Sequence, residues 1–139
     1  MYAIVDIETT GGYAANHRIT EVAIYLHDGM HITDRFHTLI NPERNIPYYI
    51  TGLTGITTEM VLEAPSFKEV AQDIFKRLDG KIFVAHNAHF DYSFLKKELS
   101  TCGEWLTINL PAKPLPNSFC WMLISPARKL NFISTVRVV

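Results

Sequence analysis

The side chains that could do chemistry gather at two places in the chain, and the first is the stretch Met1–Gly12. An apolar, β-branched run typical of a buried strand is interrupted there by two acids, Asp6 and Glu8. Successive strand side chains point to opposite faces, so these carboxylates share one face, about 7 Å apart. Burying two unpaired carboxylates together is costly unless a cation lies between them. The pair therefore predicts a site for Mg²⁺ or Mn²⁺, although two acids facing solvent on an edge strand give the same pattern.

The second place is the stretch Lys81–Asp91, which has the same form. An apolar strand runs into a polar cluster that ends in a carboxylate, Asp91. Because the carboxyl ends of neighbouring parallel strands meet at one edge of a sheet, we expect Asp91 to lie beside Asp6. Taken alone, Asp91 is equally well explained as the N-cap of the helix that follows.

Both stretches resemble motifs of one enzyme family. The string Asp6-Ile-Glu8-Thr-Thr-Gly11 resembles the first motif of the proofreading-type 3′–5′ exonucleases, the DnaQ-like or DEDD superfamily with an RNase H-like fold. The string His86-Asn-Ala-His-Phe-Asp91 resembles the second motif, and the likeness covers about the first 100 residues. It implies that Asp6, Glu8 and Asp91 are catalytic and hold two divalent metal ions, Mg²⁺ or Mn²⁺, for the hydrolysis of phosphodiester bonds at 3′ ends.

The same resemblance implies which residues bind the substrate. The turn after the first motif contacts the terminal nucleotide, the Ile46–Thr58 segment borders it, and the second motif positions it or stacks on a base. The residues are Thr9, Thr10, Gly11, Leu53, Ile56, His86, Asn87 and Phe90. On the residues alone, Ile46–Thr58 is an irregular segment that packs apolar side chains on the core, and Phe90 fits ordinary core packing as well.

The remaining pattern predicts an α/β fold. Strands at Ile19–Leu26 and Met30–Ile40, joined by a tight turn at Asp28-Gly29, form an antiparallel meander with the first strand. In the third strand the candidate core residues are Ile32, Phe36 and Leu39.

A helix–strand–helix unit follows the meander. Ser66 and Glu69 form a capping box at the start of a helix that has one apolar stripe and ends before Gly80. Lys76 and Arg77 are expected to be a solvated helix end. The next strand, Lys81–Ala85, should be parallel to a strand of the same sheet, because it follows a crossover helix. A second helix begins at about Asp91, so the predicted fold is an RNase H-like mixed sheet, incomplete at the C-terminus.

The likeness fails beyond the second motif. The family carries a third motif with a fourth carboxylate and a general base, His in the His-type members, but no Asp or His follows Asp91 here. Residues 105–139 hold several prolines and no acid. We therefore divide the chain into an exonuclease core, 1–104, and an atypical tail, 105–139, and expect the tail to be a truncated or frameshifted remainder of the same domain. The expectation for this chain is weak activity or none.

Composition bounds the class of protein. The 139 residues suit one domain, and 13 basic against 14 acidic residues give no overall electrostatic signal for nucleic acid. No apolar run is long enough to span a membrane, and acids appear where a signal peptide would be apolar, so we expect a cytoplasmic protein. Expected partners are DNA with a single-stranded or frayed 3′ end, and DNA polymerase subunits. Two alternatives stay open: a non-catalytic module that binds nucleic acid or a polymerase, and an exoribonuclease of the same fold.

Overall fold

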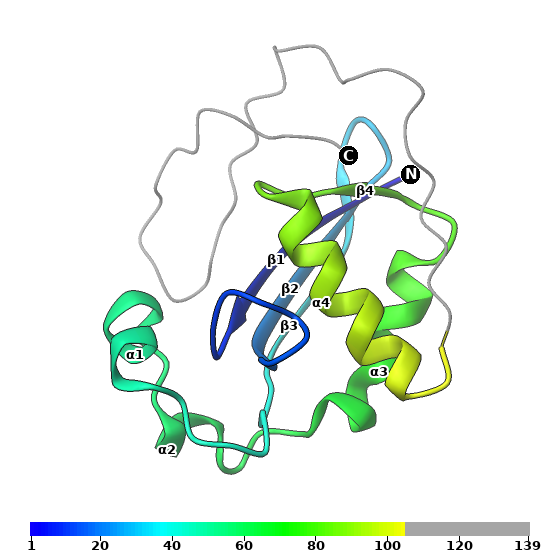
Figure 1. Cartoon of the computed structure of the whole chain (residues 1–139). Coiled ribbons are helices and arrows are strands. Elements are labelled where there is room, and N and C mark those ends of the chain that lie inside the picture. The colour runs from blue at the N-terminus through cyan, green and yellow to red at the C-terminus, as the bar shows by residue number, and fades with distance from the viewer. Residues whose placement is uncertain (105–139) are drawn as a thin grey trace.

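The computed structural model describes residues 1–104, which form a mixed sheet covered by helices (Figure 1). The strand order is β3-β2-β1-β4. The strand β1 is antiparallel to β2 and parallel to β4, and β2 is antiparallel to β3. The bounds are β1 Tyr2–Thr9, β2 Ile19–His27, β3 Ile32–Leu39 and β4 Ile82–Val84. This confirms the predicted α/β fold with an antiparallel meander followed by a parallel strand.

Two long helices, α3 (Phe67–Leu78) and α4 (Ala88–Thr101), pack against one face of the sheet (Figure 1). The capping box of Ser66 and Glu69 is present at the start of α3. The buried stripe of α3 meets strand residues from the same face of the sheet and residues of α4 in one apolar core. Its largest members include Phe67, Ile74, Leu78, Phe83, Phe94, Leu95 and Leu99.

The prediction of an irregular segment over Ile46–Thr58 was wrong. Two short helices form there, α1 (Tyr48–Thr54) and α2 (Thr58–Val61). Pro47 precedes α1, and Gly55 ends it with a left-handed φ of 80°. Helices of seven and four residues are too short to show a helical period in the sequence, and the threonines and glycine of α1 have low helix propensity. Tertiary packing of their buried residues in a second apolar cluster therefore decides the structure.

Three smaller expectations also need correction. The helix α4 begins at Ala88, with Asn87 as its N-cap, so Asp91 lies inside the first turn and is not the cap. Ile32 is 41% exposed at the start of β3 and does not belong to the core. Arg77 is not simply solvated: its Nε donates to Asp34 Oδ2 at 2.8 Å, and its guanidinium lies 4.7 Å from the ring centre of Phe36.

The predicted tail, 105–139, lies outside the described residues. Among residues 1–104, no helix has both the length and the apolar character needed to cross a membrane.

Candidate active site

The first two carboxylates lie on β1, on the face of the sheet that α3 and α4 do not cover. Ala3, Val5 and Ile7 alternate with them and belong to the apolar core. Asp6 and Glu8 are both half-buried. Burial raises the pKa of Asp6 above its ordinary value. The strand thus holds two carboxylates side by side in a partly dehydrated place, as its alternating pattern predicted.

Asp91 reaches the same place from α4. The parallel pairing of β4 with β1 ends at Ile4, and beyond that point the Asp91 carboxylate accepts a hydrogen bond from the backbone N–H of Ile7. The side chain is only 5% exposed. Burial raises the pKa of Asp91 to about 7, the neighbouring charges of Asp6 and Glu8 push it in the same direction, and the hydrogen bond from Ile7 opposes them. The fold therefore brings together the three predicted carboxylates from positions about 85 residues apart in the chain.

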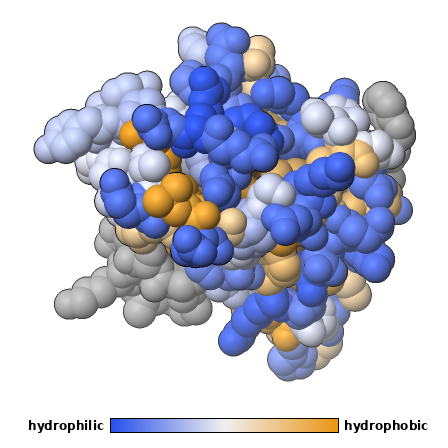
Figure 2. Space-filling model, turned by 90° about the horizontal axis from the view of Figure 1, so that it is seen from below, coloured by the Kyte–Doolittle hydropathy of each residue, from blue (hydrophilic) through white to orange (hydrophobic). Residues whose placement is uncertain are grey.

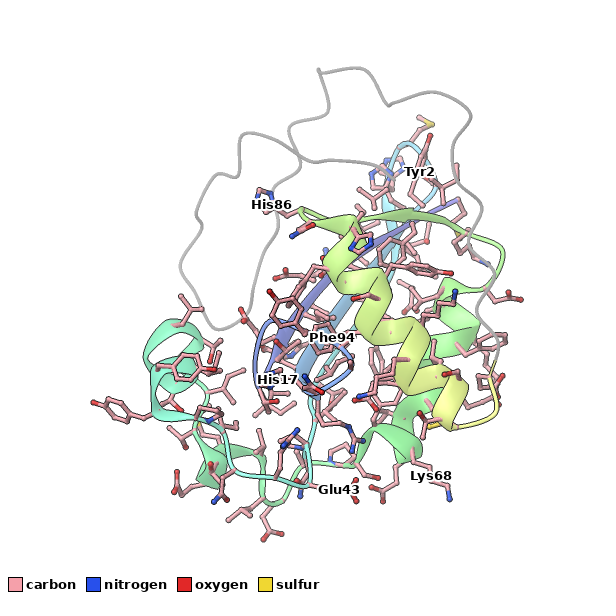
Figure 3. The ribbon with its side chains drawn as sticks, in the orientation of Figure 1. Tyr2, His17, Glu43, Lys68, His86 and Phe94 are labelled. Carbon is pink, nitrogen blue, oxygen red and sulfur yellow. The ribbon has the colours of Figure 1, made fainter. Side chains whose placement is uncertain are left out.

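The rest of the second motif surrounds the turn into α4. His86 and Asn87 are exposed, and Figure 3 shows His86 pointing away from the sheet. The charge of His86 lowers the pKa of Asp6, which places this imidazole within electrostatic reach of the carboxylates. Phe90 is half-buried against the core, with its ring centre 4.9 Å from that of Phe94. Its position at the rim leaves part of the ring accessible.

The turn after β1 is a closed, self-bonded loop. Thr9 Oγ1 donates to the carbonyl of Gly11 at 2.8 Å, and Thr10 exchanges backbone and hydroxyl hydrogen bonds with Arg18. The imidazole of His17 lies against Gly11, so that a Cβ atom added to Gly11 would lie 2.3 Å from His17 Cε1. The hydroxyls of both threonines thus shape the turn, and Gly11 is required because a neighbouring ring occupies the space of a side chain.

An ion pair fastens this turn to α4. Arg18 Nε donates to Glu98 Oε1 at 2.6 Å, and Glu98 is 3% exposed. Lys97 Nζ also lies 3.4 Å from the carbonyl oxygen of His17, which Figure 3 shows in the β1–β2 loop in front of the sheet. The helix that carries Asp91 therefore also holds the loop that follows Glu8. Sequence reasoning missed this link, because its partners are 80 residues apart.

The structure separates the two residues predicted in the Ile46–Thr58 segment. Leu53 is 68% exposed on α1, whereas Ile56 is 3% exposed and packs in the second apolar cluster. Ile56 can thus shape the segment but cannot touch a substrate with its side chain. Exposed aromatic and apolar side chains gather on α1 and α2, and Figure 2 shows an orange patch among hydrophilic residues on the side where Figure 1 places these helices.

Sequence reasoning also missed a fourth carboxylate at the site. Glu21 on β2 lies directly opposite Glu8 in the register of the sheet and is 8% exposed. Its charge, after burial, is the next cause that raises the pKa of Asp6. His37 Nε2 on β3 lies 2.6 Å from Glu21 Oε1. The sequence did contain a signal for it: the predicted antiparallel pairing of the first two strands can place Glu21 beside Glu8.

The donor set fits a hard divalent cation. The carboxylates of Asp6, Glu8 and Asp91 supply only oxygen ligands, and their mutual repulsion is the condition that a bound cation relieves. Within residues 1–104, no three ligating side chains already lie grouped as a ready-made metal site. To bind one ion in common, the three carboxylates would therefore have to draw closer together than they lie in this structure.

The fold is of the RNase H-like type, with carboxylates at the end of the first strand of a mixed sheet. The family model RNase_T, described as "Exonuclease", matches residues 3–125, and the chain belongs to this exonuclease family. The chain is 42% identical over 103 residues to the 3′–5′ exonuclease DinG of Bacillus subtilis. It is 44% identical over 106 residues to the PolC-type DNA polymerase III of Clostridium perfringens.

Those relatives are much longer proteins. The matched region is 73% and 76% of this chain but only 11% of DinG and 7% of PolC. Among solved structures, exonuclease X in complex with 5′ overhanging duplex DNA is 30% identical, with a TM-score of 0.55 over 68% of this chain and 54% of that one. Exonuclease I has a TM-score of 0.68 at 16% identity over 75% of this chain and 25% of that one, which shows the shared fold.

Proposed function

We propose that this chain is a metal-dependent 3′–5′ exonuclease that hydrolyses phosphodiester bonds at DNA ends. The observation that carries the proposal is the position of Asp91, whose carboxylate accepts a hydrogen bond from the backbone N–H of Ile7, the residue between Asp6 and Glu8 on β1. Asp91, on α4, is buried so close to Asp6 and Glu8 that their charges help to raise its pKa. Membership of the exonuclease family supports the same activity.

In this proposal Asp6, Glu8 and Asp91 hold one or two divalent ions, Mg²⁺ or Mn²⁺. When bound, such ions supply an activated water and stabilise charge on the phosphate and leaving oxygens. The protein's own part is to hold the carboxylates in place, although the burial of Asp6 and Asp91 favours their protonated forms. Asp91 has to lose its proton to bind an ion, and the backbone N–H of Ile7 favours the charged form.

The surrounding residues are assigned to the substrate. We infer that the turn at Thr9, Thr10 and Gly11 acts on the terminal nucleotide by shaping the loop beside it, since all three residues are buried and both hydroxyls are used within the loop. Leu53, exposed on α1, supplies an apolar contact to a base, and Ile56 supports it from the core. His86, Asn87 and Phe90 form the opposite border, where the accessible part of the Phe90 ring can stack on a base.

The expected substrate is DNA with a single-stranded or frayed 3′ end. The support is that exonuclease X is solved with duplex DNA and exonuclease I with oligonucleotides. An association with a DNA polymerase is a further proposal, supported by the likeness to the PolC-type polymerase. The location in the cytoplasm stays a prediction.

The test is digestion of a 3′-labelled and a 5′-labelled single-stranded oligonucleotide with Mn²⁺, with Mg²⁺ and with EDTA. Because no Asp or His follows Asp91, the expected result is slow metal-dependent shortening from the 3′ end that Asp6→Asn abolishes. The matched control is Asp79→Asn, which changes an exposed aspartate at the end of α3 and should leave the rate unchanged. Digestion that persists in EDTA or in Asp6→Asn would contradict the proposal.

Two controls separate the alternatives. An RNA oligonucleotide of the same sequence, digested faster than the DNA, would favour the exoribonuclease. Oligonucleotide binding, measured by fluorescence anisotropy, with neither digestion nor Mn²⁺ binding would favour a non-catalytic binding module, whereas Mn²⁺ binding without digestion would favour a truncated enzyme.

A further inference from the structure

A row of polar side chains crosses three strands on the face of the sheet that carries the site. Glu8 of β1 pairs with Glu21 of β2, and Asp6 pairs with Ala23, which in turn pairs with His37 of β3. Residues that lie opposite one another in antiparallel strands share a face. Asp6, Glu8, Glu21 and His37 therefore project from the same side, and the small side chain of Ala23 leaves room between them.

Glu21 is an unusual residue for this place if its role is only to stabilise the fold. It is 8% exposed, and it stands directly opposite another glutamate. Like charges opposite each other in a sheet are destabilising, and a buried charge is costly to dehydrate. It projects from the same face of the sheet as Asp6 and Glu8, one pair away from Asp6, so it belongs to the site and not only to the sheet. The mechanism proposed above makes no use of it.

His37 fixes this carboxylate. Its Nε2 lies 2.6 Å from Glu21 Oε1, and the imidazole is itself about one-third exposed. A hydrogen bond to one oxygen restricts rotation of the carboxylate, so the Glu21 charge stays on the face that Asp6 and Glu8 share. Groups that orient the ligands of a metal typically alter its affinity by about 10- to 100-fold when they are removed.

We propose that Glu21, held by His37, is a positioning residue of the metal site, which adds a fixed negative charge beside Asp6 and Glu8 and orients Glu8 toward the ion. The inference rests on the proposed metal-dependent function. It does not require Glu21 to touch the ion or the substrate. In the metal-free protein Glu8 and Glu21 repel each other. When a cation binds, its attraction for both carboxylates offsets that repulsion.

The test is calorimetric titration of the full chain with Mn²⁺, together with thermal unfolding in EDTA. Glu21→Gln keeps the shape of the side chain and a hydrogen-bond acceptor for His37 but removes the charge. We expect its Mn²⁺ dissociation constant to rise about 10- to 100-fold. Its melting temperature in EDTA should equal or exceed that of the wild type, because a repulsive charge is gone. A purely structural glutamate would give the reverse, a lower melting temperature with unchanged Mn²⁺ affinity.

Two further variants keep the test decisive. His37→Gln should weaken Mn²⁺ binding in the same direction but less, and Glu63→Gln, an exposed glutamate beyond α2, should change nothing. The Mn²⁺ concentration for half-maximal digestion should rise in parallel, while the maximal rate recovers at high Mn²⁺. Unchanged affinity in folded Glu21→Gln overturns the inference, as does a Glu21→Gln protein that fails to fold while His37→Gln binds Mn²⁺ normally. A wild type that does not bind Mn²⁺ overturns the proposed function, and this inference with it.

Discussion

The raised pKa of Asp91 predicts an unusual pH dependence of stability in the metal-free protein. The folded state keeps the Asp91 proton up to about pH 7, whereas the unfolded chain releases it near the ordinary value of 3.8. Because the folded state binds more protons between these values, the contribution of Asp91 to stability is fully present below pH 3.8 and is lost as the pH rises to about 7. At 1.36 kcal/mol for each pKa unit, the loss is at most about 4 kcal/mol.

The perturbation that isolates this effect is Asp91→Asn, which keeps an oxygen acceptor for the Ile7 N–H and cannot ionise. The assay is urea unfolding in EDTA at several pH values between 4 and 8. The expected difference is that the variant becomes more stable than the wild type as the pH rises, by up to about 4 kcal/mol at pH 8. Titrating groups far from Asp91 affect both proteins alike and cancel in the comparison, whereas Asp6 and Glu8 lose a repulsive neighbour in the variant, which changes its stability in the same direction.

Binding of Mn²⁺ gives a second comparison of the wild type with Asp91→Asn. Saturating Mn²⁺ should stabilise the wild type at pH 8 and should stabilise Asp91→Asn much less, since a ligand that binds only the folded state raises its stability. The matched control is Asp79→Asn, at an exposed position, which should follow the wild type throughout. Equal pH dependence of the wild type and Asp91→Asn in EDTA would refute the reasoning from burial and repulsion.

Three further changes test other parts of the site. Arg18→Ala leaves Glu98 buried and unpaired, so the free energy of unfolding in urea should fall by about 3 kcal/mol, which is near the low end for a broken buried pair because Arg18 is partly solvated. Arg18→Lys should recover part of this loss. A loss below about 1 kcal/mol would contradict a stabilising role for the Arg18–Glu98 pair. Gly11→Ala forces the His17 ring aside and should lower the free energy of unfolding by about 1 kcal/mol. In a double-mutant cycle, adding His17→Ala should remove most of that penalty. If the losses of the two single variants simply add, the His17 ring is not the obstacle. Leu53→Ala should change the unfolding free energy by less than about 0.5 kcal/mol, yet raise the KM for oligonucleotide digestion, and an unchanged KM would remove Leu53 from the substrate site.

The sequence alone was sufficient to predict which elements carry Asp6, Glu8 and Asp91 and how those elements are arranged. Alternation along β1 placed Asp6 and Glu8 on one face, and the crossover after α3 predicted a parallel β4 whose end delivers Asp91 to them. These features follow from local periodicity and from connection rules, which act within a few residues or along the order of elements.

What the sequence did not reveal depends on contacts between distant segments. The opposition of Glu8 and Glu21 requires the register of two strands, and the pair Arg18–Glu98 requires the packing of α4 on the β1–β2 loop. The helices α1 and α2 could not be predicted either, because their formation depends on burial of Ile50 and Val61 and not on intrinsic propensity. Exposure also separates Leu53 from Ile56, two residues that the motif alone treats alike.

The way in which β4 joins the sheet also bears on folding. The meander β1–β2–β3 forms from contacts between near neighbours, whereas the pairing of Ile4 with Val84 closes a loop of about 80 residues. Loop-closure entropy delays such non-local contacts, so the parallel pairing is expected to form late. Asp91 reaches its place beside β1 only when β4 pairs with β1. If the proposed metal site is correct, the chain should gain most of its secondary structure before its affinity for a metal, and a partly folded molecule could not cut nucleic acid until β4 is in place.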